Sequence, residues 1–252
     1  MHNTGHIRQT VIMKPKPQLF IRLTFKNLLV FVFFFFAMHE LHEQAHIITG
    51  RLICGCWGKR DFNVWDVCSN CLEQHPAAIL ATFAGPVFTF IMLWLGRYLV
   101  KFGQSAQHQS LGLVLILGNM QFGRMYMAAV GSGDEQWGLR QVFLNHDHSN
   151  ALLIKIIGFL AVLVICLPPL ITAGKAIANK RKLLVFISFL IAPLILDTVV
   201  ILILLNRILQ KGVLNMVLMP GTPLLITLWF VFCLAVVAAN FKVIAHFALK
   251  SS

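Results

Sequence analysis

The sequence predicts an all-α membrane protein that crosses the bilayer about six times. Hydrophobic residues make up 58% of the 252 positions and charged residues only 12%, whereas charged residues are about a quarter of an ordinary soluble domain. Mean hydropathy is +0.78. Apolar runs of about 20 residues, the length that a helix needs to cross a bilayer, recur along the chain. We expect one compact domain, because no fixed-period repeat or long soluble region interrupts them.

The expected spans cover, in order, residues 28 to 48, 77 to 96, 111 to 130, 151 to 173, 183 to 206 and 222 to 246. The last two are the most uniformly apolar. The first becomes polar in its last two turns, and the third carries Asn119, Gln121 and Arg124. Ionisable groups inside a membrane are costly and usually functional, so these two spans are the ones to search for a site. We expect a basic, cytoplasmic N-terminal segment at 1–27 and a core of three helices with a cysteine-containing outer loop at 28–140. Three further helices of the same domain follow at 141–252.

Positive charge is concentrated in alternate connections between the spans. A formal net charge of +12 is compatible with nucleic-acid binding, but this distribution is typical of topology signals, because basic connections face the cytoplasm. The basic residues gather before the first span, after the second and after the fourth, at Arg8, Lys14, Lys16, Arg22, Lys26, Arg97, Lys101, Lys175, Lys180, Arg181 and Lys182. We therefore expect a multi-pass protein of the cell or inner membrane, in contact with lipid and not with nucleic acid, with both termini in the cytoplasm.

The start of the chain has a competing interpretation. A basic stretch followed by an apolar run that ends near Ala37 has the outline of a cleavable signal peptide. No small-x-small cleavage site follows Ala37. We therefore favour a membrane anchor.

The strongest motif lies at the end of the first span. His42, Glu43 and His46 belong to an H-E-x-x-H sequence directly after an apolar run. Histidines four positions apart lie on one face of a helix, so both imidazoles can reach one Zn²⁺ ion. The glutamate can then serve as the general base that takes a proton from the water that the zinc activates. The alternative is a polar helix end whose imidazoles face headgroups or backbone carbonyls.

A second motif lies in the second span. Ala84-Gly85-Pro86-Val87-Phe88-Thr89 resembles the A-G-P-x-x-N signature of the site-2 protease family of membrane-embedded zinc metalloproteases, with Thr89 in place of the asparagine. The order of the motifs along the chain is also similar. The resemblance covers residues 30 to 140 and implies a zinc endopeptidase whose substrates are membrane-spanning proteins or peptides.

Asp134 is the expected third ligand. The family has an aspartate ligand in an L-D-G turn on a later helix, and the nearest equivalent is Gly131-Ser132-Gly133-Asp134-Glu135. The three small residues before Asp134 also allow the helix to unwind, so that the carboxylate can turn toward a metal. Because the first and third spans both run outward, this argument places the site near the outer face, whereas the family generally works toward the cytoplasmic side.

Other residues compete for the role of ligand or support it. Asp197 lies deep in the fifth span and needs a partner there, and we favour a salt bridge with Arg124 over direct ligation. His39 shares the helical stripe of His42 and His46, and we expect it to support the ligands rather than bind metal. Weaker candidate ligands are Glu135, His75, His146 and His148.

Four cysteines lie in the first outer connection, at Cys54, Cys56, Cys68 and Cys71. In an oxidising compartment they can form two disulfides that hold the loop over the site, which is the alternative we favour. A structural zinc bound by the four thiols is the other. Cys166 and Cys233 stand alone in apolar spans, where they suit helix packing.

The sequence therefore predicts a membrane-embedded zinc metalloprotease in which His42, His46 and Asp134 bind the metal and Glu43 is the catalytic base. The alternative of another class is a membrane zinc carrier or sensor that uses the same ligands without hydrolysis. A di-iron oxidase is disfavoured, since such enzymes need several histidine boxes and this chain has one. Nothing in the chain identifies the substrate or the oligomeric state.

Overall fold

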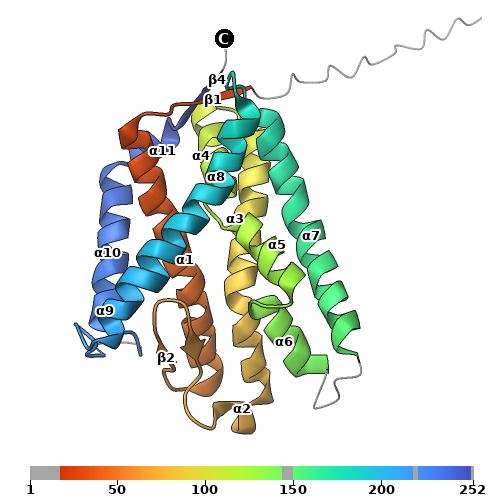
Figure 1. Ribbon diagram of the computed structural model, residues 1–252, viewed down its shortest axis with the longest axis vertical. Coiled ribbons are helices and arrows are strands. Elements are labelled where there is room, and N and C mark those ends of the chain that lie inside the picture. The colour runs from red at the N-terminus through yellow and green to blue at the C-terminus, as the bar shows by residue number, and fades with distance from the viewer. Residues whose placement is uncertain (1–17, 144–149, 218–220, 251–252) are drawn as a thin grey trace, which may run out of the picture.

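The computed structural model describes residues 18–143, 150–217 and 221–250, and these form a bundle of long helices (Figure 1). Five helical segments are long and apolar enough to cross a membrane, namely Phe25–Cys54, Pro76–Phe102, Ala106–Phe143, Ala151–Ala176 and Lys182–Gln210. The strands in the described residues are two or three residues long. The predicted all-α fold of a helical membrane protein is therefore confirmed. Arg8, Lys14, Lys16, His146 and His148 lie outside the described residues.

The first long helix, α1 (Phe25–Cys54), carries the histidine motif. Thr24 caps its start by accepting a hydrogen bond from the backbone N–H of Asn27, and Gly55 ends it in the left-handed conformation, with φ 72°. Its 30 residues span about 45 Å, against about 30 Å for the hydrocarbon core of a bilayer. The helix is therefore longer than a perpendicular crossing of a bilayer requires.

A compact loop joins α1 to the second long helix, α3 (Leu80–Phe102). It contains the hairpin of β2 (Lys59–Arg60) and β3 (Trp65–Asp66), the short helix α2 (Cys71–Gln74) and the 3-10 turn η1 (Pro76–Ile79). In Figure 1 this loop lies at the bottom of the bundle, at the end opposite β1 and β4.

Helix α3 packs closely against α4 (Ala106–Leu117). A side chain at Gly96 would lie 2.7 Å from the carbonyl oxygen of Gly112, and one at Gly112 would lie 2.6 Å from that of Gly96. The two glycines therefore let the backbones touch, which is the usual way in which membrane helices gain packing energy.

The third span is broken into three pieces, α4, α5 (Gln121–Val130) and α6 (Asp134–Phe143). The break before Asp134 is the predicted one, since Gly131 and Gly133 have φ values of 82° and 86° that glycine adopts at no steric cost. The break before α5 was not predicted. There Met120 has φ 52°, and the Asn119 side chain donates to the carbonyl of Leu115 at 2.6 Å and so takes the place of a helical N–H.

The remaining long helices are α7 (Ala151–Ala176) and α8 (Lys182–Asp197), which runs on through the π-helical segment η2 (Thr198–Leu205) into α9 (Asn206–Gln210). Phe31 of α1 contacts Phe189 edge-on, with ring centroids 4.9 Å apart, and stacks on Phe247 at 5.3 Å. This aromatic cluster joins the first helix to the last part of the chain.

The sixth helix, α10 (Leu224–Ala239), is shorter than predicted. Its 16 residues span about 24 Å, less than a bilayer core. Pro223 precedes it, and the side chain of Asn240 bonds back to the carbonyl of Val236 at 3.0 Å and ends it. The short helix α11 (Phe241–Ala245) and strand β4 (Ala248–Lys250) follow, and β4 pairs with β1 (Leu19–Ile21) in antiparallel register.

Candidate metal centre

The second half of α1 presents a stripe of ionisable side chains toward the inside of the bundle. His39, His42, Glu43 and His46 are all buried, with exposed fractions of 7%, 6%, 7% and 0%. Positions three and four apart share one face of a helix, so the stripe follows directly from the sequence. The imidazoles of the motif are therefore enclosed within the bundle, which disagrees with headgroup contact; the backbone-carbonyl contact that the same alternative expects does occur, at His46.

Asp134 approaches this stripe from the start of α6. The Nε2 atoms of His42 and His46 are 3.1 Å apart, and Asp134 Oδ2 lies 3.3 Å from the first and 3.6 Å from the second. Each residue thus directs one ligand atom to a common point, and all three atoms lie within 4.8 Å of one another. The predicted ligand set comes together although Asp134 is 88 positions from His46, that is, 134 − 46.

The outer nitrogens of both imidazoles are held by residues of α3. His46 Nδ1 lies 2.7 Å from the carbonyl oxygen of Ala81, which can only accept, so this nitrogen carries the proton and Nε2 is left with a lone pair. His42 Nδ1 lies 2.9 Å from Thr89 Oγ1. Metal-binding histidines typically have their second nitrogen fixed in this way. Thr89, which departs from the family pattern, therefore supports a ligand.

Gly85 and Trp65 enclose the two rings. A side chain at Gly85 would lie 2.6 Å from Cε1 of His42 and closer still to Nε2 of His46, so only glycine allows α3 to approach the imidazoles this closely. On the other side, the Trp65 ring from the outer hairpin stacks on His46, with centroids 4.5 Å apart and planes inclined by 11°. Gly85 of the A-G-P motif thus contributes by leaving room for the two imidazoles.

Arg124 is the cation of this cluster. Its Nη1 lies 2.8 Å from Asp134 Oδ2 and 3.2 Å from Glu135 Oε2, and its Nη2 contacts Nε2 of His42. The prediction that Arg124 pairs with Asp197 is therefore wrong. The guanidinium binds these two carboxylates because the turn at Gly131–Gly133 brings the start of α6 to it, a change of direction that apolar periodicity does not reveal.

Glu43 lies beside the ligands with one oxygen unused. Its Oε1 is 3.9 Å from His39 Nε2, whereas the buried Oε2 has no hydrogen-bond partner among the described residues. A cavity of about 50 Å³ adjoins it, also lined by Thr89 and Arg124. A space of this size holds at least one water, and the polar walls suit one. The carboxylate is therefore placed to act on a water molecule.

His39 connects Glu43 to the fifth membrane segment. His39 Nδ1 lies 2.8 Å from Asp197 Oδ1, and both residues are 7% exposed. Asp197 thus has the partner that its depth requires, and this partner is His39 rather than Arg124. Neither residue belongs to the group of three ligand atoms, which agrees with the supporting role expected of both.

A buried ion pair fixes the outer hairpin to α1. Arg60 Nη2 lies 2.8 Å from Glu40 Oε2, and both side chains are completely buried. Sequence reasoning did not single out Arg60. The available signal was Glu40 itself, since a carboxylate in an apolar helix requires a cationic partner from some other segment. The pair holds the strand that precedes Trp65, and so it positions the ring that stacks on His46.

The loop cysteines form two disulfides, Cys54 with Cys71 and Cys56 with Cys68, with Cα atoms 5.6 Å and 6.1 Å apart. This is the arrangement favoured from the sequence. Cys166 and Cys233 are buried free thiols, as helix packing predicts. The first bridge joins the end of α1 to the start of the short helix α2, and the second joins two positions within the loop between these helices.

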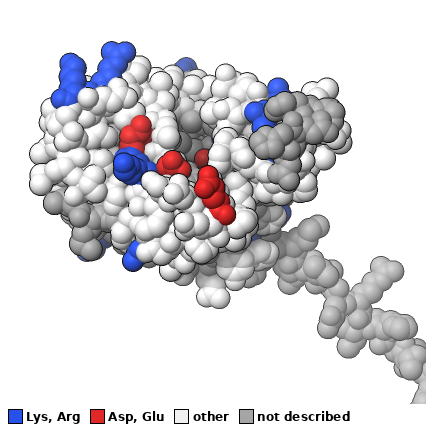
Figure 2. Space-filling model, turned by 90° about the horizontal axis from the view of Figure 1, so that it is seen from below, with Lys and Arg blue, Asp and Glu red and all other residues white. Residues whose placement is uncertain are grey.

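A cleft of about 450 Å³ leads from the surface to Asp134. The hairpin forms one wall through Trp65 and Asp66, and Trp137 of α6 contributes to the other. Seen from this end of the molecule, acidic side chains gather around a hollowed part of the surface (Figure 2). Of the weaker candidate ligands, neither Glu135 nor His75 belongs to the group of three ligand atoms within the described residues, although Glu135 binds the same Arg124 as Asp134 does.

Comparisons with protein-family models, with characterised proteins and with solved structures give no match to this chain. The interpretation of the site therefore depends on its geometry and chemistry.

Proposed function

We propose that the protein is a membrane-embedded zinc metallopeptidase, a divergent relative of the site-2 protease family. The observation that carries this proposal is the convergence of His42 Nε2, His46 Nε2 and Asp134 Oδ2 within 4.8 Å, next to a buried glutamate with a free oxygen. The resemblance of the H-E-x-x-H and A-G-P sequences to the motifs of that family supports the same conclusion.

The donor set suits zinc. Two imidazole nitrogens and one carboxylate oxygen are typical of catalytic zinc sites, which keep a fourth position for water or substrate. The hydrogen bond from His46 Nδ1 to Ala81 fixes the tautomer that offers Nε2 to a metal. The Nε2 atoms of the two histidines and the Asp134 carboxylate lie 3.1 to 3.6 Å from one another, and electron-rich atoms at this distance repel unless a cation lies between them. Among the described residues, Arg124 supplies positive charge at this point.

Bound zinc would polarise the scissile carbonyl and lower the pKa of water in the site. Glu43 takes the proton as the water oxygen bonds to the carbonyl carbon, and it returns that proton to the leaving amine nitrogen as the carbon–nitrogen bond breaks. Arg124, on α5, lies next to the ligands. Its positive charge can stabilise the negative charge that develops on the former carbonyl oxygen. His39, held by Asp197, keeps the Glu43 carboxylate in place.

The cleft indicates where a peptide binds. It runs between the hairpin and α6 and ends at Asp134, so an extended segment lying in it would bring a backbone carbonyl to the ligands. Because the walls include Trp65, Leu72 and Trp137, apolar side chains are favoured. We propose that the substrates are membrane proteins or peptides cleaved in or near the bilayer.

The distribution of charge supports one orientation in the membrane. Arg97, Lys101 and Lys175 lie near the ends of α3 and α7, at the same end of the bundle as β1 and β4 (Figure 1). We propose that this end faces the cytoplasm, with both termini, and that the disulfide-bonded loop and the cleft face the outside.

The test uses purified protein in detergent, loaded with zinc, and a mixture of synthetic peptides derived from membrane spans, with products identified by mass spectrometry. Glu43→Gln should abolish cleavage and leave one zinc per chain, because it removes the base and no ligand. Glu73→Gln, a surface change in α2, is the matched control and should leave both unchanged.

Two outcomes contradict the proposal. Cleavage that persists in Glu43→Gln would come from a contaminant or another site. Zinc binding without cleavage in the unchanged protein, across the whole mixture, would favour the carrier or sensor instead.

A further inference from the structure

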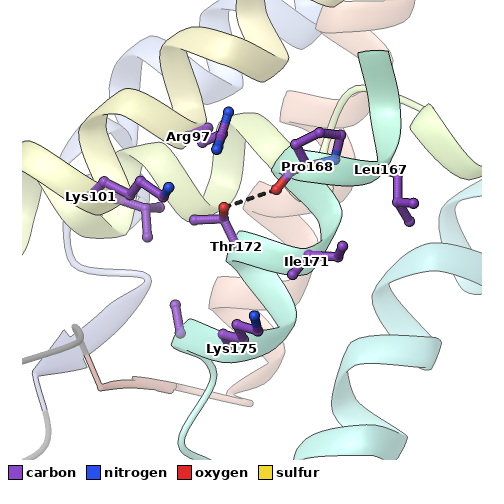
Figure 3. Close-up of a pocket in the computed structure, with 9 residues that line it drawn as sticks. Arg97, Lys101, Leu167, Pro168, Ile171, Thr172 and Lys175 are labelled. Atoms are coloured by element: carbon purple, nitrogen blue, oxygen red, sulfur yellow. Dashed lines mark hydrogen bonds between the residues drawn. The ribbon is translucent and has the colours of Figure 1, made fainter. Parts of the chain in front are cut away.

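A second cavity, of about 390 Å³, lies between the last turns of α3 and α7. It is at the end of the bundle that carries β1 and β4, opposite the disulfide-bonded loop (Figure 1). Arg97 and Lys101 reach it from α3, and Thr172 and Lys175 from α7. Figure 3 shows the three basic side chains placed around the pocket, with Thr172 between them. The volume is that of a small-molecule site.

The three cations have no acidic partner in the part of the chain that the structure describes. No ion pair of Arg97, Lys101 or Lys175 occurs within residues 18–143, 150–217 and 221–250, and the buried Nε of Arg97 makes no hydrogen bond there. Like charges that converge without a counter-ion repel one another. An anion in the pocket would remove this repulsion and satisfy the free N–H of Arg97.

The wall beside Arg97 is fixed by Trp94. The Arg97 guanidinium lies over the Trp94 ring, 4.6 Å from its centroid, and the Trp94 indole donates to the carbonyl of Ile165 at 3.2 Å. The carbonyl of Ile165 receives no hydrogen bond from its own helix, because Pro169, four positions later, has no N–H. The guanidinium therefore has a rigid support rather than a mobile surface position.

The pocket also has an apolar side and an open one. Val100, Leu167 and Ile171 line it, and Leu167 and Ile171 are 41% and 44% exposed on the outer surface of α7. Tyr98, 60% exposed, and Trp94 lie at the same level, which is typical of residues at the boundary between headgroups and hydrocarbon. A ligand here would have its charged part among the cations and an apolar part along α7.

We propose that this pocket binds the phosphate headgroup of an anionic phospholipid from the leaflet at the β1–β4 end, with an acyl chain lying along Leu167 and Ile171. Basic pockets between membrane helices recognise lipid phosphates in this way. The inference requires that the helices span a bilayer, but it does not depend on the proposed proteolysis.

The experiment measures phosphatidylglycerol bound to the protein in neutral detergent by native mass spectrometry. The triple variant Arg97→Gln, Lys101→Gln, Lys175→Gln should bind roughly 100-fold more weakly, because each cation near an anionic headgroup contributes about fivefold. The control Lys180→Gln, Arg181→Gln, Lys182→Gln removes the same charge just after α7, outside the pocket. It should retain binding within about threefold.

Three results would overturn the proposal: equal loss in the control variant, equal binding of phosphatidylcholine, or complete displacement of the lipid by excess inorganic phosphate, which would indicate a site for a free anion. Circular dichroism and the melting temperature verify that the triple variant is folded. If it is not, the single change Lys101→Gln at an exposed position should still lower affinity about fivefold, and unchanged affinity would count against the site.

Discussion

His39 Nδ1 and Asp197 Oδ1 lie 2.8 Å apart, although 158 positions separate the two residues. This bond joins α1, which carries the metal motif, to α8 at the point where it becomes a π-helix. The same His39 reaches toward Glu43 with its other nitrogen, at 3.9 Å. The fifth long helical segment is thereby connected to Glu43, the proposed base, and neither His39 nor Asp197 belongs to the group of three candidate ligands.

Replacing Asp197 by Ala should lower peptide cleavage strongly while the zinc content stays near one per chain. The change leaves His39 buried without its partner, which costs about 1–3 kcal/mol of stability, and frees it from its place beside Glu43. Asp197→Asn, which keeps a hydrogen-bond acceptor, should be milder. If His39→Ala adds little to Asp197→Ala, the two act as a unit, whereas additive losses would separate them.

Asp134→Ala should behave in the opposite way and lose the metal. One of the three proposed protein ligands disappears, and of the three only the two imidazoles of His42 and His46 remain. Metal analysis of the purified protein after dialysis provides the measurement. Should Asp197→Ala lose more zinc than Asp134→Ala, the third ligand would have to come from the fifth segment instead.

Arg124→Gln should reduce the turnover rate by about 100-fold or more and retain zinc. The side chain contributes positive charge next to the ligands, and removing one such stabilising group typically costs this much in rate. Arg140→Gln is a suitable control, since Arg140 bonds only to the carbonyl of Gly131 within the described residues. Loss of zinc in Arg124→Gln would assign the arginine to holding Asp134 rather than to the reaction.

Gly85→Ala should disrupt the metal centre. The new methyl group would lie 2.6 Å from the His42 ring, so either α3 or the imidazole must move. Gly174→Ala is the matched control in another long helix, because its methyl group would meet Phe186 at an ordinary 3.6 Å. Zinc affinity should fall only in the first variant. Equal affinity in both would show that the A-G-P motif does not shape the site.

Alkylation of the denatured, unreduced protein should modify two of its six cysteines, Cys166 and Cys233. After reduction all six should react. Peptide mapping without reduction should recover Cys54 joined to Cys71 and Cys56 joined to Cys68. Six reactive thiols before reduction, together with extra bound zinc, would instead support the structural zinc site.

Much of the candidate site could be predicted because its chemistry is local in the sequence. The spacing of His42 and His46 fixes a shared helix face, and Gly131 and Gly133 mark the break that frees Asp134. Partners across the bundle could not be predicted in the same way. Depth along a span does not say which way a helix faces. It therefore suggests Asp197 as the partner of Arg124, whereas in the structure Arg124 binds Asp134, ten positions further along the chain.

The fold shows the same division between local and distant information. Apolar length predicts five of the six expected spans, but the break at Met120 depends on the Asn119 side chain, which bonds to a carbonyl of its own helix. The contribution of Arg60 arises only after the loop folds back on Glu40. Local sequence patterns carry little information about such pairings, because their energy comes from desolvation within the assembled bundle.

The pairing of β1 with β4 has a consequence for biogenesis. Leu19 also bridges to Ile177, and Ile21 exchanges two hydrogen bonds with Asn179, so β1 has partners from the middle of the chain as well as from β4. During synthesis on the ribosome, α1 enters the membrane long before β4 is made. The sheet of β1 and β4 is therefore completed late, after the contacts of β1 with Ile177 and Asn179 can form.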